Sequence, residues 1–146
     1  MKMLGLFLVL VQLVASTTAE DPRAKKELDQ LQGKWKLNSK VTRASIEGTS
    51  TEYGLFLLFA NKGILVIKGD KLITRRIDTM LELTMVIDPS KNPKMLDAKT
   101  SRNQIVFRGI YEVSKNSLRL CISGKGDRPE EFNDTWDTPL YKYKRE

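Results

Sequence analysis

The chain has 146 residues, the usual size of one domain, with 40% hydrophobic residues, no histidine and a formal net charge of +7. Because histidine is the commonest general base and a common metal ligand, and no Gly-x-Ser-x-Gly, Ser-x-x-Lys or phosphate-loop pattern occurs, we predict a protein that is not an enzyme and has no cofactor. The positive charge suits anionic partners, but the absence of any nucleic-acid-binding motif argues against nucleic acid.

The first residues have the pattern of a secretory signal. A basic start at Lys2 precedes an apolar stretch from Leu4 to Ala15, and the small residues Ser16-Thr17-Thr18-Ala19 follow. We predict a signal peptide over 1–19, cleaved near Ala19, and a single domain over 20–146 that is secreted or periplasmic. The alternative is an uncleaved membrane anchor, which needs ~20 predominantly apolar residues. The stretch from Leu4 to Ala15 is shorter than that, so we predict no membrane span. We also predict a monomer.

A short helix followed by a strand is predicted next. Asp21 is a good N-cap, Pro22 suits the first helical position, and Gly33 supplies a stop. From Lys34 to Val41 apolar and polar residues alternate, which is typical of a strand with one buried and one exposed face. This alternation favours an antiparallel sheet.

The middle of the chain contains a loop and a hairpin. Residues 44–53 are polar and predict a loop, whereas the apolar run Leu55–Ala60 fits either a short lid helix or a strand. The segments Ile64–Ile67 and Leu72–Thr74 then flank Lys68-Gly69-Asp70-Lys71, whose glycine allows the positive φ of a tight turn.

A second hairpin and a closing strand complete the pattern. Ile105–Val113 and Leu118–Ile122 flank residues 114–117, and the acidic segment 124–139 predicts an irregular loop. Eight or nine short strands with one early helix favour an all-β, antiparallel up-and-down barrel, with a β-sandwich as the alternative. The other predicted strands are Leu81–Ile87, Met95–Thr100 and Leu140–Arg145.

The tripeptide Gly33-Lys34-Trp35, placed between the helix and the first strand, resembles the Gly-x-Trp signature of lipocalins. In that family the tryptophan plugs the barrel base and an arginine of the last strand packs across its ring, a role that the resemblance implies for Trp35 and Arg145. Such a cation–π contact contributes about 0.5 to 2 kcal/mol. We interpret Gly33, Trp35 and Arg145 as a structural clasp and not as a binding site.

The remainder of the chain is similar to a family of exported, lipocalin-like proteins of planctomycete-type bacteria. The resemblance covers nearly all of the chain after the predicted signal, and it implies a barrel fold and export, because no activity is established for that family. Asn92 and the apolar run Leu55–Phe59 depart from the pattern. The motifs that carry the resemblance are Leu31–Trp35, Ile67–Lys71, Ile87–Lys94, Gly109–Glu112, Leu118–Cys121, Arg128–Phe132 and Lys144–Glu146.

A contact between Trp35 and Arg145 would also fix which neighbouring residues of the first and last strands lie opposite each other. If Trp35 lies opposite Arg145 on antiparallel strands, then Leu37 faces Tyr143 inside the barrel. Four lysines would gather outside, either splayed and solvated or bound to an anionic partner, because like charges directly opposite are destabilising. They are Lys34, Lys36, Lys142 and Lys144.

These patterns lead to two functional hypotheses. The first is a binding module whose barrel mouth holds a small, partly apolar ligand, lined by Leu37, Tyr111, Tyr141 and Tyr143. The alternative is a cell-envelope interaction protein that binds anionic polymer or a protein partner through its outer basic surface. We predict no metal site, because the acidic residues of the 124–139 loop match no calcium-binding loop, and we expect Cys121 to be a small buried apolar group.

Overall fold

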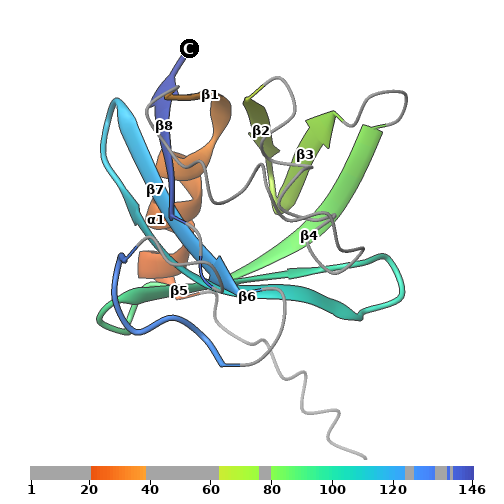
Figure 1. The fold of residues 1–146 in the computed structure, drawn as a ribbon, viewed down its shortest axis with the longest axis vertical. Helices are drawn as coiled ribbons and strands as arrows, with labels where there is room; N and C mark the ends of the chain where they lie inside the picture. The colour runs from red at the N-terminus through yellow and green to blue at the C-terminus, as the bar shows by residue number, and fades with distance from the viewer. Residues whose placement is uncertain (1–20, 39–62, 76–79, 124–126, 134–137, 139) are drawn as a thin grey trace, which may run out of the picture.

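A computed structural model of the chain describes residues 21–38, 63–75, 80–123, 127–133, 138 and 140–146. The strands pair in chain order, each antiparallel to the next, and the last pairs with the first (Figure 1). The predicted fold class, a closed all-β barrel with a short helix before it, is confirmed, and an open sandwich is excluded. The elements are α1 (Pro22–Leu31), β1 (Gly33–Leu37), β2 (Ile64–Lys68), β3 (Lys71–Arg75), β4 (Met80–Asp88), β5 (Lys94–Lys99), β6 (Ile105–Val113), β7 (Ser117–Ser123) and β8 (Leu140–Arg145).

Some predictions fall outside the described residues. These are the signal peptide over 1–19, the loop over 44–53 and the apolar run Leu55–Ala60. The first strand was predicted to reach Val41, whereas β1 ends at Leu37, and residues 39–41 also lie outside the described part.

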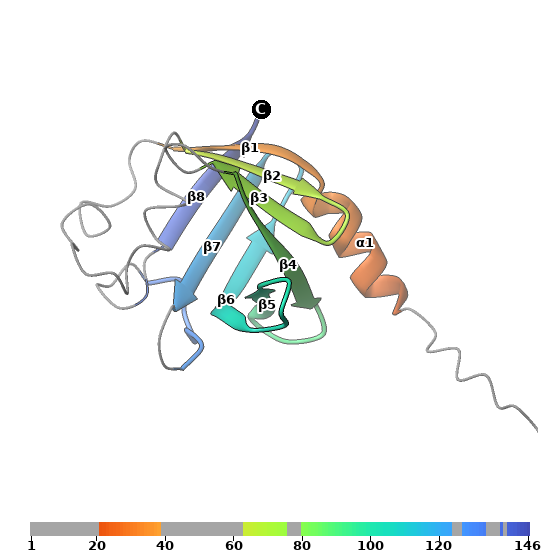
Figure 2. The same cartoon turned by 90° about the vertical axis from the view of Figure 1, so that its right-hand side faces the viewer.

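The helix α1 lies against one end of the barrel, as Figure 2 shows. The Asp21 side chain accepts a hydrogen bond from the backbone N–H of Arg23 at 3.0 Å, which caps the first turn. At the other end Leu31 is fully buried in the barrel core. The Gln32 side-chain amide bonds both backbone groups of Gly69 in the β2–β3 turn, at 2.7 and 3.0 Å. Helix and hairpin are therefore joined.

The two ends of the barrel differ. Because β1 starts directly after α1 and the strands alternate in direction, the β2–β3, β4–β5 and β6–β7 connections all lie at the helix end. We call this the α1 end and the opposite one the far end. The interior is filled mainly by apolar side chains, the largest of which are Trp35, Tyr111, Tyr141, Tyr143 and Phe107.

A second, smaller cluster lies on the outer face of the barrel. Residues 127–133, which we call the strap, pass over β6, β7 and β8 and cover apolar side chains that point outward. The Cys121 thiol is fully buried there, as predicted, and lies 3.5 Å from the Asn133 carbonyl. The cluster consists of Ile110, Cys121 and Leu140, with Phe132 of the strap packed against them.

Arg128 fastens the strap to the sheet. Its Nη1 donates to the Gly109 carbonyl at 2.8 Å, and its Nη2 lies 2.7 Å from Asp97 Oδ1. Ionic and backbone contacts therefore hold the strap at β5 and β6, while Phe132 holds it through apolar packing.

Candidate functional site

The strand pairing places three of the four predicted ligand-binding residues together. Leu37 lies opposite Tyr143 across the β1–β8 seam, as the sequence predicts, and Trp35 lies opposite Arg145. Tyr141 and Tyr143 are buried on the inner face of β8, with ring centroids 6.5 Å apart. Since side chains alternate along a strand, Tyr141, Tyr143 and Arg145 follow one another from the far end to the α1 end.

Tyr111, the fourth predicted ligand-binding residue, lies apart from the other three. Its ring is buried, but its hydroxyl lies at the α1 end, 3.2 Å from Glu27 Oε2, and Lys94 Nζ lies 2.6 Å from Glu27 Oε1. Burial, and then the neighbouring Glu27 carboxylate, raise the pKa of Tyr111 far above its ordinary value. Tyr111 therefore joins β6 to α1.

The α1 end is closed by the Trp35 ring and the Arg145 guanidinium. The guanidinium carbon lies 4.2 Å from the ring centroid, and the indole N–H donates to the Leu31 carbonyl at 2.9 Å. Gly33 has φ +118°, and a Cβ there would lie 2.9 Å from Arg145 Nη1. A side chain at residue 33 would therefore displace the guanidinium.

Arg145 also bonds three backbone carbonyls. Two belong to the end of α1 and the residue after it, where helix carbonyls lack partners within the helix, and the third belongs to the β6–β7 turn. One side chain thus joins the helix, a turn and the last strand. The carbonyls are those of Gln30, Gln32 and Lys115.

The Tyr143 hydroxyl is a buried polar group of the interior. The side chain is 2% exposed, and no hydrogen-bond partner for its oxygen exists among the described residues. Burial alone raises its pKa far above the ordinary value, so the phenol stays neutral. An unmade hydrogen bond of this kind costs about 1 to 3 kcal/mol.

Tyr143 belongs to the hydrophobic core of the barrel. Across the two neighbouring strands, Leu37 and Leu118 lie opposite Tyr143. The charged side chains of Glu27, Lys94 and Arg145 lie at the α1 end, where each has the partners described above. Tyr143 is therefore flanked by a leucine on each neighbouring strand.

The outer face of the β1–β8 seam has the predicted lysines. Lys36 lies directly opposite Lys144, and Arg119 lies opposite Lys142 on the next pair of strands. Lys34 pairs with Glu146 at 3.1 Å. This surface is therefore basic and only partly neutralised.

The chain was compared with protein-family models, curated proteins and solved structures, and none of them matches it. Within the described ranges, no three His, Cys, Asp or Glu side chains gather where they could hold a metal ion. The helical segment there is too short and polar to cross a membrane. The geometry of the barrel is therefore the main basis for a functional proposal.

Proposed function

We propose that the protein is an exported, non-catalytic binding module that holds one small, partly apolar ligand inside the barrel. The observation that carries this proposal is the Tyr143 hydroxyl, which is buried among apolar side chains with no hydrogen-bond partner in the described part of the chain. Buried polar groups in proteins nearly always have a partner, and a ligand oxygen or nitrogen would supply one.

The two barrel ends differ in how a ligand could enter. Trp35 and Arg145 obstruct the α1 end, so a ligand would reach Tyr143 from the far end and pass the Tyr141 ring first. Barrels of about eight strands are just wide enough to fill with side chains or to hold one small molecule. The ligand class is therefore a compact molecule with apolar surface and at least one polar atom.

Mass spectrometry of the native protein tests this proposal. The protein is purified without denaturation, and the compounds released on unfolding are identified by untargeted analysis. We expect a compound bound at a ratio near one to one, and less of it on the Tyr143→Phe variant. A wild-type protein that carries no compound and also binds none from a library of neutral apolar molecules would contradict the proposal.

Export is a separate part of the proposal and has its own test. The full chain is expressed in a bacterial host, and the intact mass of the product outside the cytoplasm is measured. Loss of residues 1–19 is expected. A product that retains these residues inside the cells would contradict cleavage near Ala19.

A further inference from the structure

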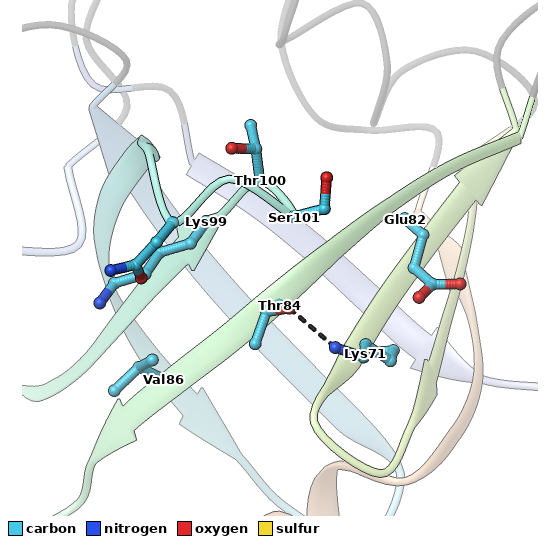
Figure 3. A pocket seen from close by; sticks show the side chains of 8 residues that line it. Lys71, Glu82, Thr84, Val86, Lys99, Thr100 and Ser101 are labelled. Carbon is cyan, nitrogen blue, oxygen red and sulfur yellow. Dashed lines mark hydrogen bonds between the residues drawn. The ribbon is translucent and has the colours of Figure 1, made fainter.

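The outer face of the barrel has a polar hollow of about 360 Å³ over β3, β4 and β5 (Figure 3). It lies on the opposite side of the sheet from Tyr143, because its central residue, Thr84, stands between the buried Leu83 and Met85. It is therefore independent of the interior site. Its lining residues are Lys71, Glu82, Thr84, Val86, Lys99, Thr100, Ser101 and Asn103.

Strand register aligns two lysines across this hollow. Lys71 lies opposite Thr84 on β4, and Thr84 lies opposite Lys99 on β5. Neighbouring strands are about 4.8 Å apart, so Thr84 stands midway between two ammonium-bearing side chains whose backbones are separated by about 10 Å. Figure 3 shows Lys71 and Lys99 on either side of Thr84.

The hydrogen bond of Lys71 orients the threonine hydroxyl. Lys71 Nζ donates to Thr84 Oγ1 at 2.8 Å, and Asp70 Oδ1 lies 3.7 Å from the same nitrogen. Because the Thr84 oxygen accepts this bond, its own O–H is left to donate to a ligand. No carboxylate of the described residues lies within ion-pair distance of Lys99. The centre of the hollow therefore offers donors to an anion.

The remaining lining residues add a hydrogen-bond acceptor, hydroxyl groups and a small apolar surface. Glu82 is exposed at the Lys71 side and forms no ion pair within the described ranges, so its carboxylate can accept hydrogen bonds from hydroxyl groups. Thr100 and Ser101 add hydroxyls at the rim, and Val86, 49% exposed, adds a small apolar surface. A ligand that suits all of these groups has a carboxylate, several hydroxyls and an apolar C–H face.

We propose that this hollow binds an acidic sugar residue of an anionic polysaccharide. The sugar carboxylate lies between Lys71 and Lys99 and accepts the Thr84 hydroxyl, while a sugar hydroxyl donates to Glu82. A free phosphate ion would use only Lys71, Lys99 and the Thr84 hydroxyl, and it has no hydroxyl group that remains to donate to Glu82 once it is fully ionised. Recognition therefore depends on the carboxylate and the hydroxyls together.

Calorimetry with a galacturonic acid tetrasaccharide tests the proposal on the full protein. Thr84→Val keeps the net charge and the shape of the side chain, and we expect about tenfold weaker binding because one charge-assisted hydrogen bond is lost. Lys99→Gln is expected to weaken binding by a similar factor. The matched controls are Lys36→Gln and Lys144→Gln, which remove the same charge from the β1–β8 seam and should change binding less than about threefold.

Other outcomes would overturn the proposal. If Thr84→Val binds the tetrasaccharide as wild type does, or if the two seam variants lose as much affinity as Lys99→Gln, the attraction is a general one to surface lysines. Wild-type protein that fails to bind the tetrasaccharide, or that binds a neutral galactose tetrasaccharide or inorganic phosphate equally well, also contradicts it. Thermal unfolding of each variant shows whether it is folded.

Discussion

The guanidinium of Arg145, in the last strand, lies 4.2 Å from the ring centroid of Trp35, in the first strand. The two residues are also directly opposite each other in the β1–β8 ladder. This contact closes the barrel laterally and covers its α1 end. Barrel closure and the shape of the proposed ligand site therefore depend on the same pair of side chains.

Arg145→Met is expected to destabilise the protein by about 3 kcal/mol, because the contact with Trp35 and the bonds to three backbone carbonyls are lost together. Urea unfolding measures the change. The matched control is Lys144→Met, an exposed neighbour on the outer face, which should alter the free energy of unfolding by less than about 0.5 kcal/mol. Equal losses in the two variants would contradict the clasp.

Gly33→Ala should cost about 2 kcal/mol, since alanine is strained at φ +118° and its Cβ would lie 2.9 Å from Arg145 Nη1. Gly69 is a useful comparison, because it has φ +60° and a Cβ added there would meet nothing within 4 Å. Gly69→Asn should therefore cost less than about 1 kcal/mol. Thermal or urea unfolding distinguishes the two, and similar losses would rule out the close approach at Gly33.

The Tyr143→Phe and Tyr111→Phe variants should shift stability in opposite directions. Removing the unpartnered Tyr143 hydroxyl is expected to raise the free energy of unfolding of the ligand-free protein by about 1 kcal/mol. Removing the Tyr111 hydroxyl leaves Glu27 without one of its partners and should lower it by about 1 kcal/mol. Ligand-free protein is prepared by unfolding and refolding before the urea titrations.

Alkaline pH should destabilise the fold through Tyr143. Burial raises its pKa, so above about pH 10 the phenol ionises in the unfolded state while it stays neutral in the folded state. The unfolded state then binds fewer protons, and the free energy of unfolding falls by about 1.4 kcal/mol per pH unit from this one group. Tyr143→Phe should remove that part of the slope. An unchanged slope would show that the phenol is not buried.

Phe132→Ala should expose the Cys121 thiol. The strap covers this thiol, and loss of the Phe132 ring removes its apolar contact with the outer cluster. We expect thiol-specific reagents to modify the native protein about tenfold faster than wild type, because local opening becomes easier. Ile105→Ala, at a 44% exposed position, is the control. A rate unaffected by Phe132→Ala would mean that the strap does not protect the thiol.

Much of the barrel could be predicted from local patterns. Alternation with a period of two assigns each residue of a strand to one face, so the inward positions of Trp35, Tyr141 and Tyr143 followed from the sequence. The turns after Lys68 and before Ser117 followed from their short polar connections. The resemblance to lipocalins implied that Trp35 meets Arg145, and this pairing sets the register of the seam, including the position of Lys36 beside Lys144.

The sequence by itself thus determined the all-β class and the faces of the strands, because these depend on alternation and turn chemistry. The contact between the first and last strands was an expectation that the resemblance to lipocalins supplied. The tertiary structure alone decided which side chains meet across long separations. Tyr111 reaches Glu27 over 84 positions, and Lys71 and Lys99 flank Thr84 only through the register of three strands. Period-two alternation assigns a side chain to one face of the sheet, but it does not give the position of that side chain along the barrel axis. That position depends on the register between neighbouring strands and on where the helix packs against the barrel.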